Sequence, residues 1–416
     1  MIHTKPFAIP KDLAKRAWKE VKSNSGSCGI DGVTLSMYEN NLESNLYKLW
    51  NRMSSGSYFP QGVKSVAIPK KQGGERILGI PAVEDRIAQT MVKLIFEPHV
   101  EPHFYEDSYG YRANKSALDA ISVTRSRCWK LDWVLEYDIK GLFDNIDQEL
   151  LMKAVKLHTK EKWIILYIER WLKSSSIGVD GAAIERTRGI PQGGVISPIL
   201  ANLFLHYVLD HWLHKHYPSI PWCRYSDDGL LHCKTYQEVQ QMLTIVEQRL
   251  NECGLMLHPD KTRIVYCKDD IRKRNFSNTS FEFLGYCFRS RSTKSKFKNK
   301  CFCGFNPAVS KSSVKAIYQK IRSWGIIRRT GSTLQEIAEE INPILRGWIE
   351  YYGRYYATEL YKVFRHINSI LTKWLMRKYG KLRKHKTRSG LFLTRIIKEQ
   401  PSLFVHWKLG VVGVVA

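Results

Sequence analysis

The order of expected strands and helices between residues 133 and 267 limits the fold of this chain most. Residues 133–138 (WVLEYD) predict a strand, because half of them are aromatic or β-branched. Residues 221–233 (PWCRYSDDGLLHC) predict a hairpin with a tight Ser-Asp-Asp-Gly turn. Helices are expected at residues 148–158, with Asp147 as the N-cap, at residues 197–216 and at residues 236–253, and a last strand is expected at residues 263–267. Strand, helix, hairpin, helix and strand form the plan of a split βαβ sheet, so an α+β fold is predicted.

Three aspartates are expected at one edge of this sheet. Asp227 and Asp228 lie at the tip of the hairpin, where a tight turn lets both carboxylates face the same edge, and Asp138 ends another strand. Such carboxylates would repel one another unless divalent cations lay between them, and oxygen ligands suit Mg²⁺. Two ions roughly 3.5–4 Å apart can activate a 3′-hydroxyl and stabilise leaving pyrophosphate. The pattern predicts nucleotidyl transfer, although an isolated Asp-Asp-Gly is more often only a surface turn.

A glycine-rich segment at residues 188–198 (RGIPQGGVISP) leads into a helix. Gly193 and Gly194 permit close backbone approach, and Gln192 can hydrogen-bond a base or a sugar. Alone, this segment indicates only a loop.

The charge of the chain indicates a polyanionic partner. The net charge is +26, and residues 294–416, which have a helical pattern from residue 312, hold 25 Lys and Arg against 6 Asp and Glu. Nucleic acid is the default partner, since aromatic residues are interleaved with the charge. A solvated basic tail is the alternative, and no long apolar helix suggests a membrane surface.

The nine cysteines have no paired spacing, and neither a signal peptide nor a run of 18 apolar residues is visible. A reducing cytosol with free thiols is therefore expected. Zinc is not expected at Cys301 and Cys303, nor at the histidines of residues 206–216, which are interpreted as a solvated helix face.

Several motifs, in order, resemble those of reverse transcriptases encoded by group II introns. Tyr225-Ser226-Asp227-Asp228 resembles the Tyr-x-Asp-Asp box of that family. Further resemblances lie at residues 26–32 (GSCGIDG), 80–89 (IPAVEDRIAQ), 107–112 (DSYGYR), 136–146, 188–202, 254–262 (GLMLHPDKT), 281–286 (FEFLGY) and 348–352 (WIEYY). Together they span about residues 20 to 380.

The resemblance implies a right-hand polymerase, with fingers, a palm built on the split βαβ sheet, and a helical thumb or maturase domain. The expected boundaries are 1–60 for an N-terminal extension, 61–130 for fingers, 131–290 for the palm, 291–378 for the thumb and 379–416 for a basic tail that could bind DNA. Residues 188–202 would lie at the junction of fingers and palm, and residues 290–300 are expected to be a linker.

The resemblance also implies roles for single residues. Asp138, Asp227 and Asp228 would hold two Mg²⁺ ions, for which Mn²⁺ could substitute, with the Ile139 carbonyl as a further ligand. The incoming dNTP would contact Lys70, Arg76, Phe143, Gln192 and Lys261. Primer and template would contact Arg112, Gly193, Tyr225, Ser226, Trp348 and Tyr352.

Phe143 would occupy the place of a ribose 2′-hydroxyl and so select DNA as the product, whereas the neighbouring Asp144 is also a mark of RNA-directed RNA polymerases. Ser226 departs from the alanine that is common at this place in the family. No Cys/His-rich segment follows the basic tail, so the compact type without an endonuclease domain is expected.

The predicted function is RNA-directed DNA synthesis combined with maturase activity, in which the protein holds intron RNA and assists splicing and mobility. The expected partners are an RNA template, intron RNA, a DNA primer or target and dNTPs, without a membrane. One alternative is a domesticated reverse transcriptase acting in host defence or DNA repair. Another is a non-catalytic RNA-binding splicing factor. Monomer and homodimer both remain open.

Overall fold

The structure is a computed structural model that describes residues 5–69, 75–178, 182–294 and 301–411. The described residues form two compact units. Unit 1 is drawn from Met1–Ala120 and Leu135–Arg263, and unit 2 from Ile121–Val134 and Ile264–Ala416. Helix α5 (Ala117–Cys128) and strand β3 (Trp133–Asp138) contribute residues to both units.

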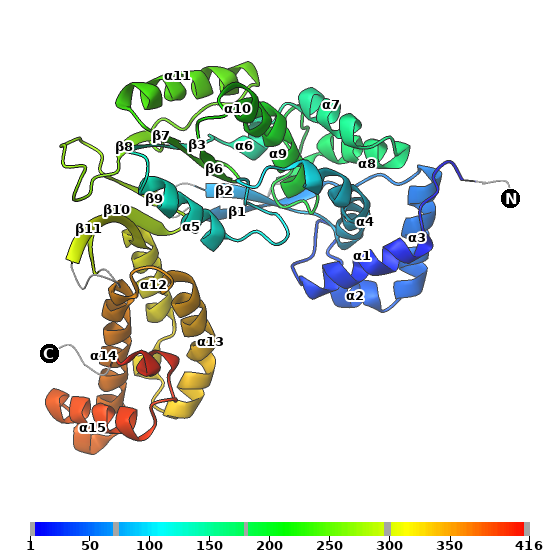
Figure 1. Ribbon diagram of the computed structural model, residues 1–416. Helices are drawn as coiled ribbons and strands as arrows, with labels where there is room; N and C mark the ends of the chain where they lie inside the picture. Colours follow the sequence, from blue (N-terminus) through cyan, green and yellow to red (C-terminus); the bar gives the residue numbers. More distant parts are fainter. Residues whose placement is uncertain (1–4, 70–74, 179–181, 295–300, 412–416) are drawn as a thin grey trace. The chain divides into compact units, whose positions relative to one another are not determined.

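A four-stranded sheet with the order β6-β7-β3-β8 carries the expected strands of the split βαβ plan. Its other strands are β6 (Trp222–Tyr225), β7 (Asp228–Cys233) and β8 (Arg263–Tyr266). Nearly every side chain of β3 and β7 is buried, because helices such as α11 (Tyr236–Glu252) cover the sheet (Figure 1). The predicted fold class is confirmed.

Local sequence explains where several helices of unit 1 begin. The Asp147 side chain accepts a hydrogen bond of 2.8 Å from Leu150 N at the start of α7, as the sequence predicted, and Thr235 caps α11. The helix expected at residues 197–216 is not uniform, because a π-helical turn, η2 (His206–Asp210), separates two α-helical parts. The remaining helices of unit 1 are α1 (Lys11–Ser23), α2 (Leu35–Glu39), α3 (Leu42–Ser55), α4 (Val83–Val100), η1 (Glu101–His103), α6 (Leu142–Asn145), α7 (Gln148–His158), α8 (Lys162–Leu172), α9 (Ser197–Leu205) and α10 (His211–His216).

A second sheet of unit 1 has the order β2-β1-β4-β5. Strands β1 (Val63–Pro69) and β2 (Glu75–Ile80) pair antiparallel within residues 61–130, the range expected for the fingers. The short strands β4 (Ser176–Ile177) and β5 (Ala183–Ile184) extend this sheet, with β4 parallel to β1.

Unit 2 begins with an antiparallel sheet in the order β11-β10-β9. Its strands are β9 (Ser280–Phe283), β10 (Tyr286–Lys294) and β11 (Cys301–Val309). The linker predicted from residue 290 is wrong for its first residues, since Ser290–Lys294 belong to β10 and pair with β11. Arg291 in this stretch is buried and donates to the Asn306 carbonyl of β11, a partner that the polar composition of the stretch did not indicate.

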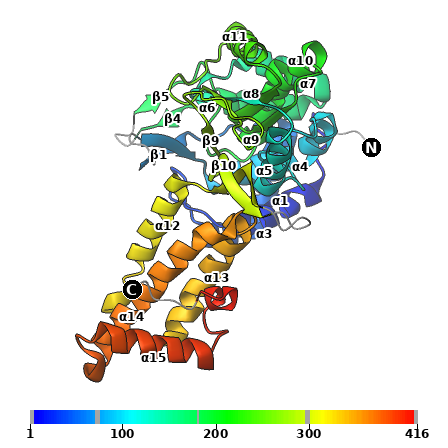
Figure 2. The same ribbon diagram turned by 60° about the vertical axis from the view of Figure 1, so that its left-hand side comes forward.

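The helices of unit 2 enclose a long apolar core. They are α12 (Lys311–Ser323), η3 (Ile326–Arg328), α13 (Leu334–Tyr352), η4 (Ala357–Leu360), α14 (Tyr361–Lys378), η5 (Gly380–Leu382), α15 (Lys386–Glu399) and η6 (Val405–Leu409). Figure 2 shows α15 lying across the end of α14, against which it packs. None of the helices within the described ranges has the length and apolar character needed to cross a bilayer.

The residues expected to form a basic tail are partly built into this core. Leu393, Phe404 and Trp407 are buried among the helices. Asn368 on α14 accepts a hydrogen bond from Trp407 Nε1 at 2.9 Å and pairs with His406 Nε2 at the same distance. Apolar side chains were spread thinly among lysines and arginines, which hid this packing in the sequence.

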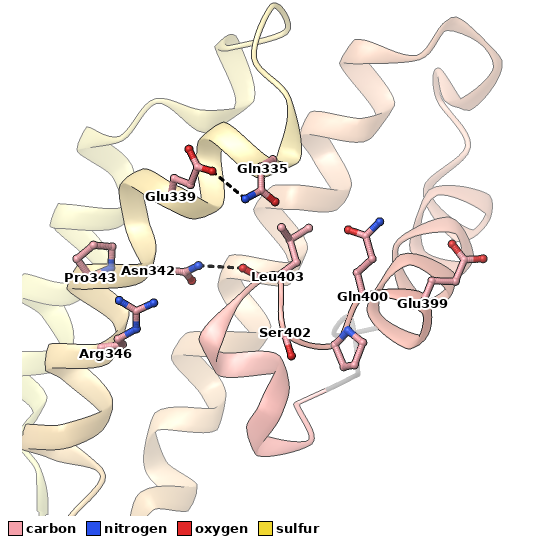
Figure 3. A pocket seen from close by; sticks show the side chains of 10 residues that line it. Gln335, Glu339, Asn342, Pro343, Arg346, Glu399, Gln400, Ser402 and Leu403 are labelled. Atoms are coloured by element: carbon pink, nitrogen blue, oxygen red, sulfur yellow. Dashed lines mark hydrogen bonds between the residues drawn. The ribbon is translucent and has the colours of Figure 1, made fainter.

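A polar pocket of about 710 Å³ lies between α13 and the segment that follows α15 (Figure 3). Within it, Gln335 Nε2 donates to Glu339, and Asn342 Nδ2 donates to the Leu403 carbonyl at 2.9 Å. The bond from Asn342 to Leu403, together with one of 3.1 Å from Val405 N to Asn342 Oδ1, fastens residues 403–405 to α13.

Candidate active site

The β6–β7 hairpin brings Asp227 and Asp228 to the edge of the sheet. Tyr225 pairs with Asp228, so Ser226 and Asp227 form the turn between the strands. The Asp227 carbonyl accepts a hydrogen bond of 3.2 Å from the backbone N–H of Ile139, which follows β3. The turn is thereby fastened next to the end of β3, where Asp138 lies.

The carboxylates of Asp138 and Asp228 meet. Burial raises the pKa of Asp228, and the negative charges of Asp227 and Asp138, together with a hydrogen bond to Asp138, raise it further. Lys261 Nζ lies 3.0 Å from Asp138 Oδ1, and its positive charge lowers the pKa of Asp228. The protein therefore concentrates negative charge at this edge and neutralises it in part with a proton and in part with Lys261.

These residues fit a divalent cation that is shared with substrate. In the described ranges, no group of three or more His, Cys, Asp or Glu side chains could hold a metal ion by itself. Mg²⁺ ordinarily takes one or two carboxylates and completes its shell with water and substrate phosphates. The negative charges of Asp138 and Asp227 raise the pKa of Asp228, and a cation bound among these carboxylates would relieve their repulsion.

Ser226 has a strained backbone that a buried arginine supports. Its φ is +60°, in the left-handed region, which costs a non-glycine residue about 1 kcal/mol or more. Arg224, which is completely buried, donates from Nη1 to the Ser226 carbonyl at 3.1 Å. The same guanidinium forms a two-pronged ion pair with the buried Asp210, at 2.8 and 2.6 Å.

Two glycines allow close packing around the hairpin. A side chain at Gly110 would come within 2.5 Å of the Ser226 nitrogen, and one at Gly229 would overlap the ring of Tyr137. Glycine is required at both places because backbone or ring atoms already fill the space.

The glycine-rich segment lies against the short helix α6. Gly189 has a φ of +75°, and a side chain there would collide with the carbonyls of Phe143 and Asp144. Gln192 Nε2 lies 3.2 and 3.1 Å from the two carboxylate oxygens of Asp144. This contact fixes the amide of Gln192 beside the helix that carries Phe143.

The same segment also contacts the β1–β2 hairpin. Gly79 N donates to the Gln192 carbonyl at 2.6 Å, and Gly193, with a φ of +105°, packs against the Gly79 backbone. The two segments expected to bind the nucleotide are therefore joined by their backbones.

Comparison with known families explains this arrangement. Residues 68–288 match the family described as reverse transcriptase (RNA-dependent DNA polymerase), which is more than half of the chain. The chain belongs to the reverse transcriptase family. Residues 314–391 of this reverse transcriptase match the maturase-specific domain of group II introns, so the predicted family is confirmed. Reverse transcriptases use divalent metal ions, and the two domains imply binding to RNA and DNA.

Individual relatives agree with the family match. The reverse transcriptase is 32% identical to the protein YkfC of Escherichia coli K12, over 67% of this chain and 80% of YkfC. It is also 32% identical to the group II intron-encoded protein LtrA of Lactococcus lactis, over 48% of this chain and 33% of LtrA. The chain therefore spans about a third of the length of LtrA.

Among solved structures, a telomerase from Candida albicans in complex with a fragment of telomeric RNA has a TM-score of 0.47. It has 14% identity to this reverse transcriptase, and the match covers 92% of this chain and 69% of the telomerase chain. A truncated apo telomerase from Candida tropicalis has a TM-score of 0.44 and 16% identity, and covers 56% of this chain and 53% of its own.

Some of the residues predicted to bind the nucleotide lie at this site. Lys261 contacts Asp138, and Phe143 and Gln192 lie on α6 and the adjoining segment. Arg76 is part of β2, where its backbone pairs with Ile68. Lys70 lies outside the described residues.

The residues predicted to bind primer and template are more dispersed. Tyr225 and Ser226 lie in the β6–β7 hairpin, whereas the side chain of Arg112 bonds to the protein itself. Its side chain is 5% exposed and donates to Glu101 and to the carbonyls of Tyr105 and Ser108. These bonds give Arg112 a structural role within the protein, whereas the sequence assigned this arginine to nucleic acid.

Trp348 and Tyr352 belong to unit 2. Trp348 stacks on Trp324 with ring centroids 5.6 Å apart, and Tyr352 lies against Tyr286, beside the turn at Gly285. Both side chains support the packing of α13, and their contact with nucleic acid stays a prediction.

Sequence reasoning missed the support beneath the hairpin. Arg224 lies in an otherwise apolar strand, and a charged residue in such a strand needs a buried partner, which was the available signal. Its partner Asp210 lies within the histidine-rich segment that was interpreted as solvated. That interpretation is wrong for His206, which is buried, and burial together with His211 lowers the pKa of His206 to about 4.

Proposed function

We propose that this chain is an RNA-directed DNA polymerase that extends a primer with dNTPs. The contact between Asp138 and Asp228 beside Asp227 carries the proposal, because it concentrates carboxylates where the family places its chemistry. These three aspartates would hold two Mg²⁺ ions, or Mn²⁺ in their place. Bound there, the metal ions activate the primer 3′-hydroxyl and stabilise the leaving pyrophosphate.

The protein side chains would position the substrates. Asp228 must lose its proton before it can bind a cation, since only the carboxylate is a ligand. Lys261 is placed to leave Asp138 and meet the negative charge of a triphosphate. Ile139, whose N–H donates to the Asp227 carbonyl, would offer its own carbonyl as a further metal ligand.

The sugar would lie between Phe143 and Gln192. Phe143 is 8% exposed and cannot move aside easily, so it would exclude a 2′-hydroxyl. Asp144 holds the side-chain amide of Gln192 and Gly79 holds its backbone carbonyl, so both ends of this residue are fixed. Lys70 and Arg76 would contact the triphosphate, as the resemblance to the family implies.

Primer extension on an RNA template tests the proposal. We expect dNTP incorporation that depends on Mg²⁺, and a loss of about a thousandfold or more in Asp227→Ala, since the site then lacks one ligand. Asp12→Ala, at an exposed carboxylate of α1, is the control and should keep wild-type activity. Equal activity in wild type and Asp227→Ala would disprove the assignment.

We further propose that unit 2 binds intron RNA and assists splicing. Residues 294–416 hold 25 Lys and Arg against 6 Asp and Glu, which supports this role. Lys381, Arg383 and Lys384 are exposed on unit 2. Phosphate contacts should make binding steeply salt-dependent.

Replacing these three residues with glutamate tests the RNA-binding role. We expect weaker binding of intron RNA and a log–log salt slope that is smaller by about 0.7–0.9 for each phosphate that the protein no longer neutralises. The charge-preserving variant Lys381→Arg/Arg383→Lys/Lys384→Arg is the matched control. An unchanged slope in the glutamate variant would remove this surface from the RNA interface.

A further inference from the structure

Arg224 uses its whole hydrogen-bonding capacity beneath the hairpin that carries two of the aspartates. An arginine has five N–H donors, and all five of Arg224 have acceptors. Two go to Asp210, and one each goes to Asn202 Oδ1 at 3.1 Å, Ser108 Oγ at 2.9 Å and the Ser226 carbonyl at 3.1 Å. The residue is 0% exposed, so none of these bonds competes with water.

The acceptors come from four different segments. Ser108 lies in the loop before α5, Asn202 on α9 and Asp210 in the π-helical turn η2, while Ser226 is in the hairpin turn. Asn202 also donates from Nδ2 to the Gly110 carbonyl at 2.7 Å, and Gly110 packs on the Ser226 backbone. One guanidinium therefore joins the turn to its surroundings on several sides.

A stabilising role alone does not explain why this pair is charged. A buried ion pair is often no more stabilising than apolar side chains of similar volume. An apolar pair could not donate to the Ser226 carbonyl, which belongs to the one residue of the turn with a left-handed backbone. A lone arginine could donate, but its buried charge would need a partner such as Asp210.

The π-helical turn is a second observation that points the same way. Asp210 is the last residue of this wide turn, and turns of this kind often mark functional sites. The turn directs Asp210 toward β6, although the helix otherwise continues into α10.

We propose that Arg224 and Asp210 are positioning residues that hold the Ser226–Asp227 turn in its left-handed conformation and thereby set the affinity of Asp227 and Asp228 for metal. This inference rests on the proposed polymerase function. Neither residue touches substrate, so their effect on the reaction passes through the turn.

The double variant Arg224→Met/Asp210→Leu removes both charges together. It leaves no unpaired charge in the core, so the fold should persist. On a preformed RNA template with a DNA primer, we expect the Mg²⁺ concentration for half-maximal single-turnover rate to rise about tenfold or more, as for other residues that orient metal ligands. Binding of primer–template without metal should stay near the wild-type value.

The buried pair of Tyr58 and Asp85 offers a matched control. Tyr58 donates to Asp85 in the same unit, and both are at most 3% exposed, but their bonds run to Gln61 rather than to the hairpin. Tyr58→Phe/Asp85→Leu should change the melting temperature without changing the Mg²⁺ requirement. An equal Mg²⁺ shift in both double variants would reduce Arg224 and Asp210 to general support and overturn the proposal.

A glycine at residue 226 separates positioning from loss of packing. Glycine adopts a positive φ without the steric cost that Ser226 bears. Ser226→Gly should raise the Mg²⁺ affinity by a larger factor in the Arg224→Met/Asp210→Leu background than in the wild-type background. An identical effect in both backgrounds would contradict a role for the pair in holding the left-handed turn.

Arg224→Lys provides the answer if the double variant does not fold. Lysine keeps the charge opposite Asp210 but lacks the fork that reaches Ser226, so the Mg²⁺ requirement should rise in the same direction. If Arg224→Lys folds and its Mg²⁺ requirement is unchanged, the positioning role is refuted. The proposed function still stands in that case, provided that wild type is active and Asp227→Ala is inactive. An inactive wild type would instead refute the proposed function.

Discussion

The β6–β7 hairpin of unit 1 and the helical core of unit 2 each cover a buried polar cluster, but the two clusters differ in charge and in the segment that they hold. Beneath the hairpin, Arg224 and Asp210 form an ion pair that supports a strained turn. In unit 2, Asn368 joins His406 and Trp407 through neutral hydrogen bonds that fasten the last described residues to α14. A neutral amide is sufficient to attach a chain segment, whereas a strained turn needs several donors fixed in one fork.

The largest effect should come from removing apolar packing in unit 2. Phe404 is fully buried and lies 4.6 Å from Trp407 between ring centroids, so Phe404→Ala should destabilise unit 2 by about 3–5 kcal/mol. Hydrogen exchange should quicken in α14 and α15 and stay unchanged in β6 and β7. Equal quickening in the hairpin would show that the two clusters belong to one cooperative unit, and the contrast between them would disappear.

The next largest effect should come from acid, which should destabilise the neutral cluster of unit 2 by protonating His406. Burial lowers the pKa of His406 to about 3, and its Nδ1 has no hydrogen-bond partner within the described residues. Because the folded pKa lies below the ordinary value of 6.5, the stability that neutral His406 contributes is complete above pH 6.5 and is lost as the pH falls. Between pH 6.5 and 5 the loss should be about 2 kcal/mol.

Melting curves of wild type and His406→Asn over this pH range measure the effect. The variant should lose most of the pH dependence of unit 2. His206→Asn is the parallel variant in unit 1, where burial also lowers the pKa of the histidine, and it should leave the pH dependence of unit 2 intact. A wild-type curve that is flat between pH 6.5 and 5 would contradict a buried, neutral His406.

The smallest effect concerns the aspartates without metal. The pKa of Asp228 is raised in the folded protein. The contribution of Asp228 to the free energy of unfolding is therefore greatest at low pH and falls as the pH rises above the ordinary pKa of 3.8. In EDTA at pH 8, Asp228→Asn should therefore be more stable than wild type by about 1–2 kcal/mol. Added Mg²⁺ should raise the melting temperature of wild type more than that of the variant. Asp12→Asn is the control, and a less stable Asp228→Asn would indicate that the carboxylates do not repel.

The parts of the molecule that were predicted from sequence are those set by short stretches of chain. The N-cap at Asp147 and the Ser226–Asp227 turn follow from residues within a few positions of one another. The alignment of Asp138 with this hairpin followed from the order of strands, because few topologies accommodate that order.

The parts that were missed depend on contacts between distant segments. Arg224 pairs with Asp210 across 14 positions and with Ser108 across 116, and no local pattern encodes such partners. The burial of Phe404 and Trp407 likewise depends on α13 and α14, while the surrounding lysines and arginines indicated an exposed tail. The Arg112 side chain donates to a carboxylate and two carbonyls of the protein, partners that the sequence did not indicate, and its contact with nucleic acid stays a prediction.

The π-helical turn at His206–Asp210 makes the spacing of the chain as important as its chemistry. Each residue of an α-helix advances by about 100°, so deleting one residue from this turn would rotate Asp210 away from Arg224 without altering either side chain. An in-frame deletion of a single codon there would leave every aspartate of the catalytic set in place and still misalign the hairpin. Surveys of insertions and deletions should therefore find this short segment as intolerant as the Tyr-Ser-Asp-Asp box itself.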